Sequence, residues 1–292
     1  MVLVTLITLS WGLHWPLIKV GLSEIPPFTF RGIAVVTGGL ALMALAVWRR
    51  QRLWPRRREA LALLWTSMCN VAVWQMLTAY ALQLLPAGRA VVLAYTMPIW
   101  SVVLGALFLS ESIDRPRLTA LALGTAGMAL LIGEDMLIVG RAPLGSIMIL
   151  SAAFIWAVGT VSTKGFQWSL SLPAMVGWQL LIAAVPMLIG AVVFERTSWV
   201  LPSAWPAFAL GYNILIASIL AYLVWFRLLA LYSAGIASIS VLLIPVVGLF
   251  SGAAILGEPI GLAELGALVL VVGSIAAAHQ PWKRTKRDET AP

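Results

Sequence analysis

Charged side chains are scarce in this chain, and so are metal ligands and thiols. Of its 292 residues, 10% are Asp, Glu, Lys or Arg, compared with about 25% in an ordinary soluble domain. His14, His279 and Cys69 are too few ligands for a metal centre, and one cysteine excludes an intramolecular disulfide. The sequence also lacks a Gly-x-Ser-x-Gly motif and a Walker A motif, the signatures of serine hydrolases and P-loop ATPases. We therefore expect no cofactor and no enzymatic activity.

Apolar residues, in contrast, make up 61% of the chain. They form runs of about 20 residues, the length that a helix needs to cross the roughly 30 Å hydrocarbon layer. The runs do not alternate as the strands of a membrane barrel do, so the sequence predicts an all-α integral membrane protein. The net charge of +8 comes from basic residues in short loops, which indicates membrane orientation rather than nucleic-acid binding.

Charged and Pro/Gly-rich breaks divide the chain into ten predicted transmembrane helices. The first run holds His14 and Lys19 and follows no basic region, so we interpret it as a retained helix and not as a signal peptide. Residues 280–292 are polar and are predicted to form a disordered tail. The ten predicted segments are residues 2–20, 28–48, 60–82, 87–110, 116–133, 144–164, 173–194, 205–229, 234–256 and 260–279.

The distribution of lysine and arginine predicts how this bundle is oriented. The face with more of these residues is expected to be cytoplasmic, which places both termini in the cytoplasm of a multi-pass protein of a bacterial inner (cell) membrane. The predicted cytoplasmic face holds Arg49, Arg50, Arg52, Arg56, Arg57, Arg58, Arg115, Arg117, Lys164, Arg227, Lys283, Arg284, Lys286 and Arg287. The opposite face holds Lys19, Arg31, Arg89, Arg141 and Arg196.

The two halves of the sequence share one sparse pattern: an Ala-Gly pair, a proline, a glycine and a glutamate at fixed spacing. Five predicted helices per half is an odd number, so the second half enters the membrane from the opposite side and the repeat is inverted. Two inverted halves can exchange conformations and open a central site to either side in turn. The matched residues are Ala87, Gly88, Pro98, Gly105 and Glu111 and, 147 residues later, Ala234, Gly235, Pro245, Gly252 and Glu258; Trp11 and Lys19 recur after 145 residues as Trp156 and Lys164.

In these duplicated segments the chain resembles the drug/metabolite transporter superfamily, in its ten-helix branch with paired EamA repeats. The resemblance extends to about residue 279 and implies one EamA-like repeat at residues 1–135, a second at 142–279 and a cytoplasmic polar tail at 280–292. It also implies a central cavity lined mainly by helices 1, 3, 4, 6, 8 and 9, with helices 5 and 10 at the periphery. Within the branch, the chain with its many tryptophans and tyrosines most resembles YddG-type exporters of aromatic amino acids.

The repeated proline and glutamate are the candidate gating residues. Pro98 and Pro245 each lie about ten residues into a helix, near the middle of the bilayer at 1.5 Å per residue. They are expected to kink both helices at the same depth, either as a gating hinge or as a static bend. Glu111 and Glu258 end the same helices, where the helix dipole disfavours a carboxylate. We expect them to have partners, arginines or backbone amides of an adjacent helix start, and to form a latch or gate.

The candidate binding residues are polar and aromatic side chains predicted to lie deep in the bundle. His14 is the one ionisable group that the sequence places there; it could bind a substrate carboxylate or move a proton, or be a neutral histidine bonded to a neighbouring helix. Lys19 either snorkels to the surface or gives the outer mouth positive charge. The set as a whole favours an amphipathic organic solute over a simple ion. Its members are His14, Trp15, Lys19, Trp74, Gln75, Thr78, Tyr95, Trp100, Trp156, Thr160, Tyr212 and Tyr222.

Together these features predict a secondary transporter that moves amino acids or similar small amphipathic metabolites, chiefly aromatic or apolar amino acids, by alternating access. Export is expected from the resemblance alone. Another exporter of this superfamily, specific for a different metabolite or drug, is the alternative within the class; a membrane-embedded enzyme, a channel or a non-transporting receptor are the alternatives outside it. The expected partners are a small-molecule substrate and the lipid bilayer, with no nucleic acid, and we expect a monomer, with a dimer as the alternative.

Overall fold

The computed structural model describes residues 2–111, 115–137, 142–234, 236–237, 241 and 243–278, and all regular structure in these residues is helical. Residues 280–292 with their predicted tail, and also Arg141, Gly235 and His279, lie outside the described residues. The helices are α1 (Val2–Leu22), α2 (Pro27–Trp48), α3 (Arg57–Ser67), η1 (Met68–Val73), α4 (Trp74–Leu82), α5 (Ala87–Ala94), α6 (Met97–Leu109), α7 (Arg115–Leu137), α8 (Ala142–Gly165), α9 (Leu172–Gly190), η2 (Ala191–Glu195), η3 (Arg196–Ser198), α10 (Ala204–Tyr212), η4 (Asn213–Ala221), α11 (Tyr222–Leu231), α13 (Ile244–Leu256) and α14 (Leu262–Ala278).

These elements build the predicted membrane-crossing segments of an all-α bundle. Seven of the described helical stretches are long and apolar enough to cross a bilayer, and three shorter apolar helices complete the set. Large apolar side chains such as Leu107 and Phe194 face outward, as expected where lipid replaces water. Two crossing segments contain a π-helical stretch in their middle, η1 in the third and η4 in the eighth, and such wider turns are frequent at functional sites.

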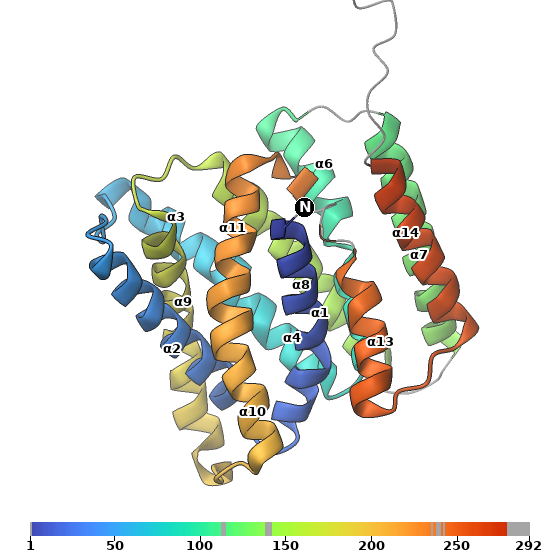
Figure 1. Cartoon of the computed structure of the whole chain (residues 1–292), viewed down its shortest axis with the longest axis horizontal. Helices are drawn as coiled ribbons and strands as arrows, with labels where there is room; N and C mark the ends of the chain where they lie inside the picture. The colour runs from blue at the N-terminus through green and yellow to red at the C-terminus, as the bar shows by residue number, and fades with distance from the viewer. Residues whose placement is uncertain are drawn as a thin grey trace, which may run out of the picture.

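Equivalent helices of the two halves pack in pairs. The second and seventh segments, α2 and α9, lie against each other at one side of the bundle, and the fifth and tenth, α7 and α14, lie against each other at the opposite side (Figure 1). In the centre, Trp11 meets its repeat equivalent Trp156 edge to face, with ring centroids 5.7 Å apart. Gln75 likewise donates a hydrogen bond of 3.3 Å to the hydroxyl of Tyr222, which follows it by 147 residues. A pseudo-two-fold axis therefore passes between these pairs, and the predicted fold of two inverted five-helix repeats is confirmed.

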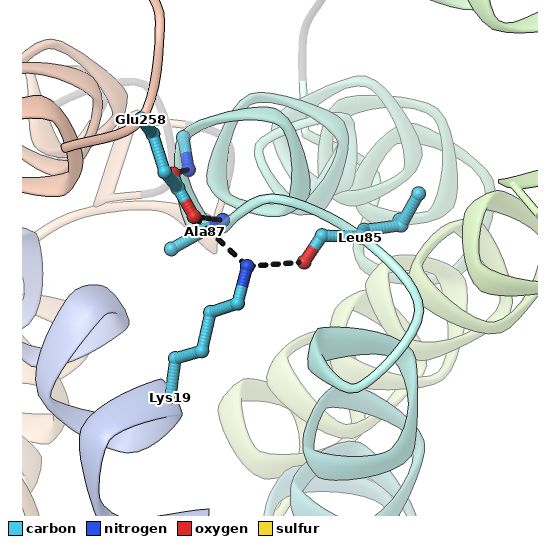
Figure 2. A network of polar contacts seen from close by, with 5 residues as sticks. Lys19, Leu85, Ala87 and Glu258 are labelled. Carbon is cyan, nitrogen blue, oxygen red and sulfur yellow. Dashed lines mark hydrogen bonds and ion pairs between the residues drawn. The ribbon is translucent and has the colours of Figure 1, made fainter. Parts of the chain in front are cut away.

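The duplicated Ala-Gly and Glu elements are where the two halves exchange contacts. Glu258 of the second half accepts hydrogen bonds from the backbone N–H groups of Ala87, at 2.8 Å, and Gly88, at 3.0 Å, and so caps the start of α5 in the first half (Figure 2). Glu111 of the first half reciprocally accepts a bond of 2.8 Å from the N–H of Ala234. Backbone amides at a helix start, one of the two kinds of partner expected for these carboxylates, satisfy orphan donors there and favour negative charge.

The glycine of each motif makes room for this carboxylate. α6 and α13 both end in a left-handed residue, Ser110 with φ 54° and Gly257 with φ 66°, so that the chain turns back over the last helical turn. A Cβ atom at Gly105 or at Gly252 would lie 3.0 Å from the carboxylate of the glutamate six residues later. The spacing between glycine and glutamate thus follows from a helix-ending turn that folds its acid back onto the helix.

A second pair of contacts also joins the two repeats: at each end of the bundle, a glutamate of the first half binds a serine of the second half. Glu24, in the loop after α1, accepts bonds from the N–H and the hydroxyl of Ser203, at 2.6 and 2.7 Å. At the other end of the bundle Glu59 accepts bonds from the N–H and the hydroxyl of Ser169, and Ser169 follows Glu24 by 145 residues. The backbone N–H of Ser203, then its hydroxyl, lowers the pKa of Glu24 below its usual value, against a smaller opposing effect of desolvation.

Candidate functional site

A cavity lies on the pseudo-two-fold axis and is lined by both halves. The space that protein atoms do not fill there, including the part that is open to the outside, is about 510 Å³. Its wall comes from α1, α2, α4, the α5–α6 junction, α8 and the η4–α11 segment, because these elements turn their bulky or polar faces inward at the same depth. The lining residues are Trp11, His14, Trp15, Ile18, Arg31, Trp74, Gln75, Thr78, Tyr95, Met97, Trp156, Asn213, Ala217, Ser218 and Tyr222.

Aromatic rings form a continuous part of this wall. Trp74 lies between Trp156, with ring centroids 4.9 Å apart, and Trp15, at 6.4 Å. Trp156 also contacts Trp11 and Tyr222, at 5.7 and 5.9 Å. Edge-to-face and tilted contacts of this kind are favourable beyond the apolar area that they bury. They hold the rings of four helices in one rigid surface that suits a flat apolar group.

Amide groups interrupt the aromatic surface and are only partly satisfied. Nδ2 of Asn213 lies 2.6 Å from Nε2 of His14. Since an amide nitrogen only donates, the histidine nitrogen accepts, and the ring proton of the neutral imidazole lies on Nδ1. Among the described residues, Oδ1 of Asn213, Oε1 of Gln75 and Nε1 of Trp156 are buried without a hydrogen-bond partner. Buried polar atoms of this kind are costly unless a ligand or water reaches them.

Of the described residues that line the cavity, Arg31 is the one cationic side chain apart from the titratable His14. It projects from the second turn of α2 and is 2% exposed. One terminal guanidinium nitrogen donates a weak hydrogen bond of 3.3 Å to Oγ1 of Thr78. The central guanidinium carbon, Cζ, lies 5.9 Å from the ring centre of Phe30. Its Nε has no partner, and no carboxylate of the described residues forms an ion pair with it. Among the described residues, the wall contains no Asp or Glu.

The structure brings together eight of the twelve predicted binding residues: His14, Trp15, Trp74, Gln75, Thr78, Tyr95, Trp156 and Tyr222 line the cavity. The other four lie elsewhere. Trp100 is 39% exposed and packs edge to face on Phe154 outside the bundle centre. The hydroxyl of Tyr212 donates to the carbonyl of Ser10, and Thr160 is buried beside the cavity but outside its wall.

Lys19, the fourth of these, is an element of the contact between the halves. Its ammonium group forms an ion pair of 2.9 Å with Glu258 and donates a bond of 3.2 Å to the carbonyl oxygen of Leu85 (Figure 2). The equivalent Lys164 donates a bond of 2.9 Å to the carbonyl oxygen of Leu229 at the other end of the bundle. Each lysine therefore binds a carbonyl near the end of a helix in its own repeat, where positive charge is favoured.

Arg31 is not among the residues predicted to line the cavity, because its charge was assigned to one membrane face and His14 was expected to be the only deep ionisable group. α2 starts at Pro27, which leaves Arg31 inside the helix on its inward face. The expected set of lining helices changes accordingly: α2 contributes to the wall, and the described residues of the ninth segment do not. A signal was present, because an arginine four residues after a helix-starting Pro-Pro pair lies one turn into the helix.

The two prolines lie at breaks in their helices. Tyr95 and Thr96 separate α5 from α6, whose second residue is Pro98. Pro245 is likewise the second residue of α13, and Leu243 precedes that helix as its cap. In the first half the helix is thus interrupted beside the cavity, and in the second half the described residues show a helix that starts at Ile244; the role of either proline as a hinge stays a prediction. Proline at such a position is pre-organised to start a helix rather than to continue one.

Ten crossing segments, an inverted repeat and a polar-aromatic cavity on the axis between the halves define a multi-pass membrane carrier. The profile of the EamA-like transporter family matches residues 1–133 and 143–278. The chain belongs to this family, and it is therefore a membrane transporter, not an enzyme, with a small-molecule substrate and the lipid bilayer as its partners.

Similar proteins agree with this assignment. The chain is 29% identical over 272 residues to the uncharacterized transporter YoaV of Bacillus subtilis, covering 91% of this chain and 92% of that one. It is 29% identical over 282 residues to a probable amino-acid metabolite efflux pump of Salmonella typhimurium, covering 93% and 92%. A protein of known crystal structure superposes with a TM-score of 0.72 at 20% identity, covering 94% of this chain and 97% of the other, which shows a shared fold.

Proposed function

We propose that this protein exports amino acids or closely similar small amphipathic metabolites, chiefly aromatic or apolar amino acids, across a bacterial inner membrane by alternating access. The observation that carries the proposal is the wall of the cavity, where tryptophan rings from both halves lie beside amide groups whose oxygens have no hydrogen-bond partner. Such a wall suits a solute with one apolar and one polar end. The similarity to a probable amino-acid metabolite efflux pump supports both the substrate class and the direction.

The moving parts in this proposal are the helices that carry the repeated motif. The interruption before Pro98 lies beside the cavity, and α13 starts at Ile244, one residue before Pro245, so each half-helix can swing without breaking a continuous hydrogen-bond ladder. The contacts of Glu111 and Glu258 join the outer ends of these segments across the repeat. We assign them as latches, one at each end of the cavity, and both are formed in this structure.

The remaining features of the proposal are the domain bounds, the orientation and the assembly. We place the repeats at residues 1–135 and 142–279, with residues 280–292 as a tail. Both termini are assigned to the cytoplasm, because the face that carries Arg49 to Arg58 is the more basic one. The protein is proposed to act as a monomer, since each chain encloses a complete cavity.

The test is reconstitution of the purified protein into liposomes with a panel of radiolabelled amino acids, with and without a pH gradient. We expect saturable flux that unlabelled tryptophan and phenylalanine inhibit. A matched pair of variants then locates the site on one helical segment: Trp74→Leu removes a ring from the cavity wall, whereas Trp65→Leu removes one that is 51% exposed on the outer surface. The first variant should raise the half-saturating concentration and the second should not.

Two results would contradict parts of this proposal separately. Liposomes that show no protein-dependent flux of any amino acid would refute the substrate class and favour an exporter of another metabolite or drug. Equal flux by the wild-type protein and by Pro98→Ala and Pro245→Ala, tested singly and together, would refute the hinge while leaving the substrate unaffected.

A further inference from the structure

Arg31 is a charged group that the fold itself does not use. The guanidinium has five N–H donors, and among the described residues it makes one hydrogen bond, to Thr78, with no carboxylate partner. Glu195 and Glu258, two carboxylates in its own end of the bundle, are engaged elsewhere, with the first turn of α2 and with the start of α5. The charge therefore faces a cavity whose described lining residues carry no opposite charge.

The internal repeat shows that this position needs no arginine for packing. The residues that follow Arg31 by 145 and 146 places, Val176 and Gly177, lie on α9, the helix that pairs with α2 across the pseudo-symmetry. Neither is polar, and Val176 is fully buried. An apolar residue at the equivalent place supports the same helix pair. Because a buried and unpaired charge destabilises a protein, its presence on one side only indicates a task other than folding.

The chemistry of the guanidinium identifies what it would bind. Its planar fork matches a carboxylate in two parallel hydrogen bonds, and such charge-assisted pairs are the strongest hydrogen bonds in proteins. Trp15 and Trp74 line the same cavity and offer ring faces for an apolar group attached to that carboxylate. Among the described residues of the wall, no carboxylate offers an equivalent site for an ammonium group, which would find only neutral acceptors such as the amide oxygens of Gln75 and Asn213.

We propose that Arg31 is the substrate-anchoring residue of the cavity and that the transported compound must carry a carboxylate next to an apolar, ring-sized body, whereas its amino group is dispensable. This inference rests on the proposed function and narrows it. Aromatic amino acids satisfy the requirement, and so do aromatic acids without an amine. Amines without an acid do not.

Binding is measured first, because it does not depend on flux. The probes are tryptophan, indole-3-propionate, which keeps the carboxylate and lacks the amine, and tryptamine, which keeps the amine and lacks the carboxylate. The readouts are the thermal shift of the purified protein and isothermal titration. Tryptophan and indole-3-propionate should stabilise the protein and tryptamine should not. Arg31→Gln should weaken acid binding about 100-fold by removing two charge-assisted bonds, and Arg31→Lys about 10-fold by keeping the charge without the fork.

The control variant is Arg196→Gln, which removes an exposed arginine at the start of η3 and should leave acid binding unchanged. A second readout separates anchoring from a structural role: without ligand, Arg31→Gln should melt at least as high as the wild-type protein, since an unpaired buried charge has gone. Tryptamine binding as tight as that of indole-3-propionate, or acid binding by Arg31→Gln at wild-type strength, would overturn the inference. A lower melting temperature of Arg31→Gln would likewise show a structural residue and overturn it. Liposomes without amino-acid flux would refute the proposed function and leave the binding result standing.

Discussion

The contact between Glu258 and the start of α5 gives the sharpest prediction of stability, because one side chain makes both an ion pair and a helix cap. Glu258→Gln keeps one acceptor oxygen, so one of the two N–H bonds from Ala87 and Gly88 is lost. A charge-assisted bond contributes about 1.5–3 kcal/mol. The ion pair with Lys19, whose side chain is 35% exposed, contributes about 0.2–1 kcal/mol. The predicted loss is about 2–4 kcal/mol, or roughly 4–8 °C in melting temperature for a chain of this size.

The comparison that tests this reasoning is Lys19→Met, which removes the ion pair and the bond to the carbonyl oxygen of Leu85 but leaves the cap intact. Melting is followed by size-exclusion chromatography of the detergent-solubilised protein after heating at graded temperatures. We expect Glu258→Gln to melt clearly below Lys19→Met, which in turn melts within about 2 °C of the wild-type protein, since the pair adds under about 1 kcal/mol. Equal shifts in the two variants would show that the ion pair, and not the capping of backbone amides, holds this end of the bundle.

Three further perturbations follow from the structure. Gly252→Ala places a Cβ atom 3.0 Å from the carboxylate of Glu258 and should destabilise the protein by about 1–3 kcal/mol, whereas Gly211→Ala, with no atom within 4 Å of the new methyl group, should be neutral or stabilising in the same melting assay. Glu24→Gln should lower the melting temperature at pH 7, and the difference from the wild-type protein should shrink as the pH falls below about 4.5. The reason is that the bonds from Ser203 lower the pKa of Glu24 in the folded state. Their stabilisation is present above the pKa of the unfolded state and is lost as the pH falls through the pKa of the folded state. A potential of 100 mV across liposomes, worth about 2.3 kcal/mol per charge, should drive the flux of indole-3-propionate toward the positive side and leave tryptophan flux unchanged; equal responses would refute net anion transport.

The helices and the duplication were predictable because both depend on local or periodic signals. Hydrophobic runs have a minimum length fixed by the bilayer, and the spacing of 147 residues can be counted without knowing the fold. The same spacing reappears in space as the bond between Gln75 and Tyr222. The exchange of partners was less accessible: the glutamates were expected to find arginines or backbone amides, but only the folded chain shows that each caps a helix of the other repeat.

The cavity was predicted less completely, because residue type does not tell which face of a helix points inward. Tyr95 and Trp100 both lie in the fourth segment, yet Tyr95 lines the cavity whereas Trp100 packs on Phe154 outside it. The interruption at Thr96 is the reason. Because the helix ends at Ala94 and a new one starts at Met97, the helical periodicity does not continue across the break. The face on which a residue of α6 lies therefore cannot be counted from residues of α5.

Residues that match between the two repeats and residues that differ between them have different roles in this molecule. The matched positions, from Gly105 and Gly252 to the two capping glutamates, form turns and caps that any carrier of this architecture needs. Arg31 has no matched counterpart and contributes nothing to them. Because a symmetric scaffold alone offers the same surface twice, a solute with two different ends can bind in one orientation only where the symmetry is broken. We infer that the unmatched arginine is one such break at the cavity wall, beside unlike equivalents such as Gln75 and Tyr222, and that recognition takes place where the two halves of the sequence differ.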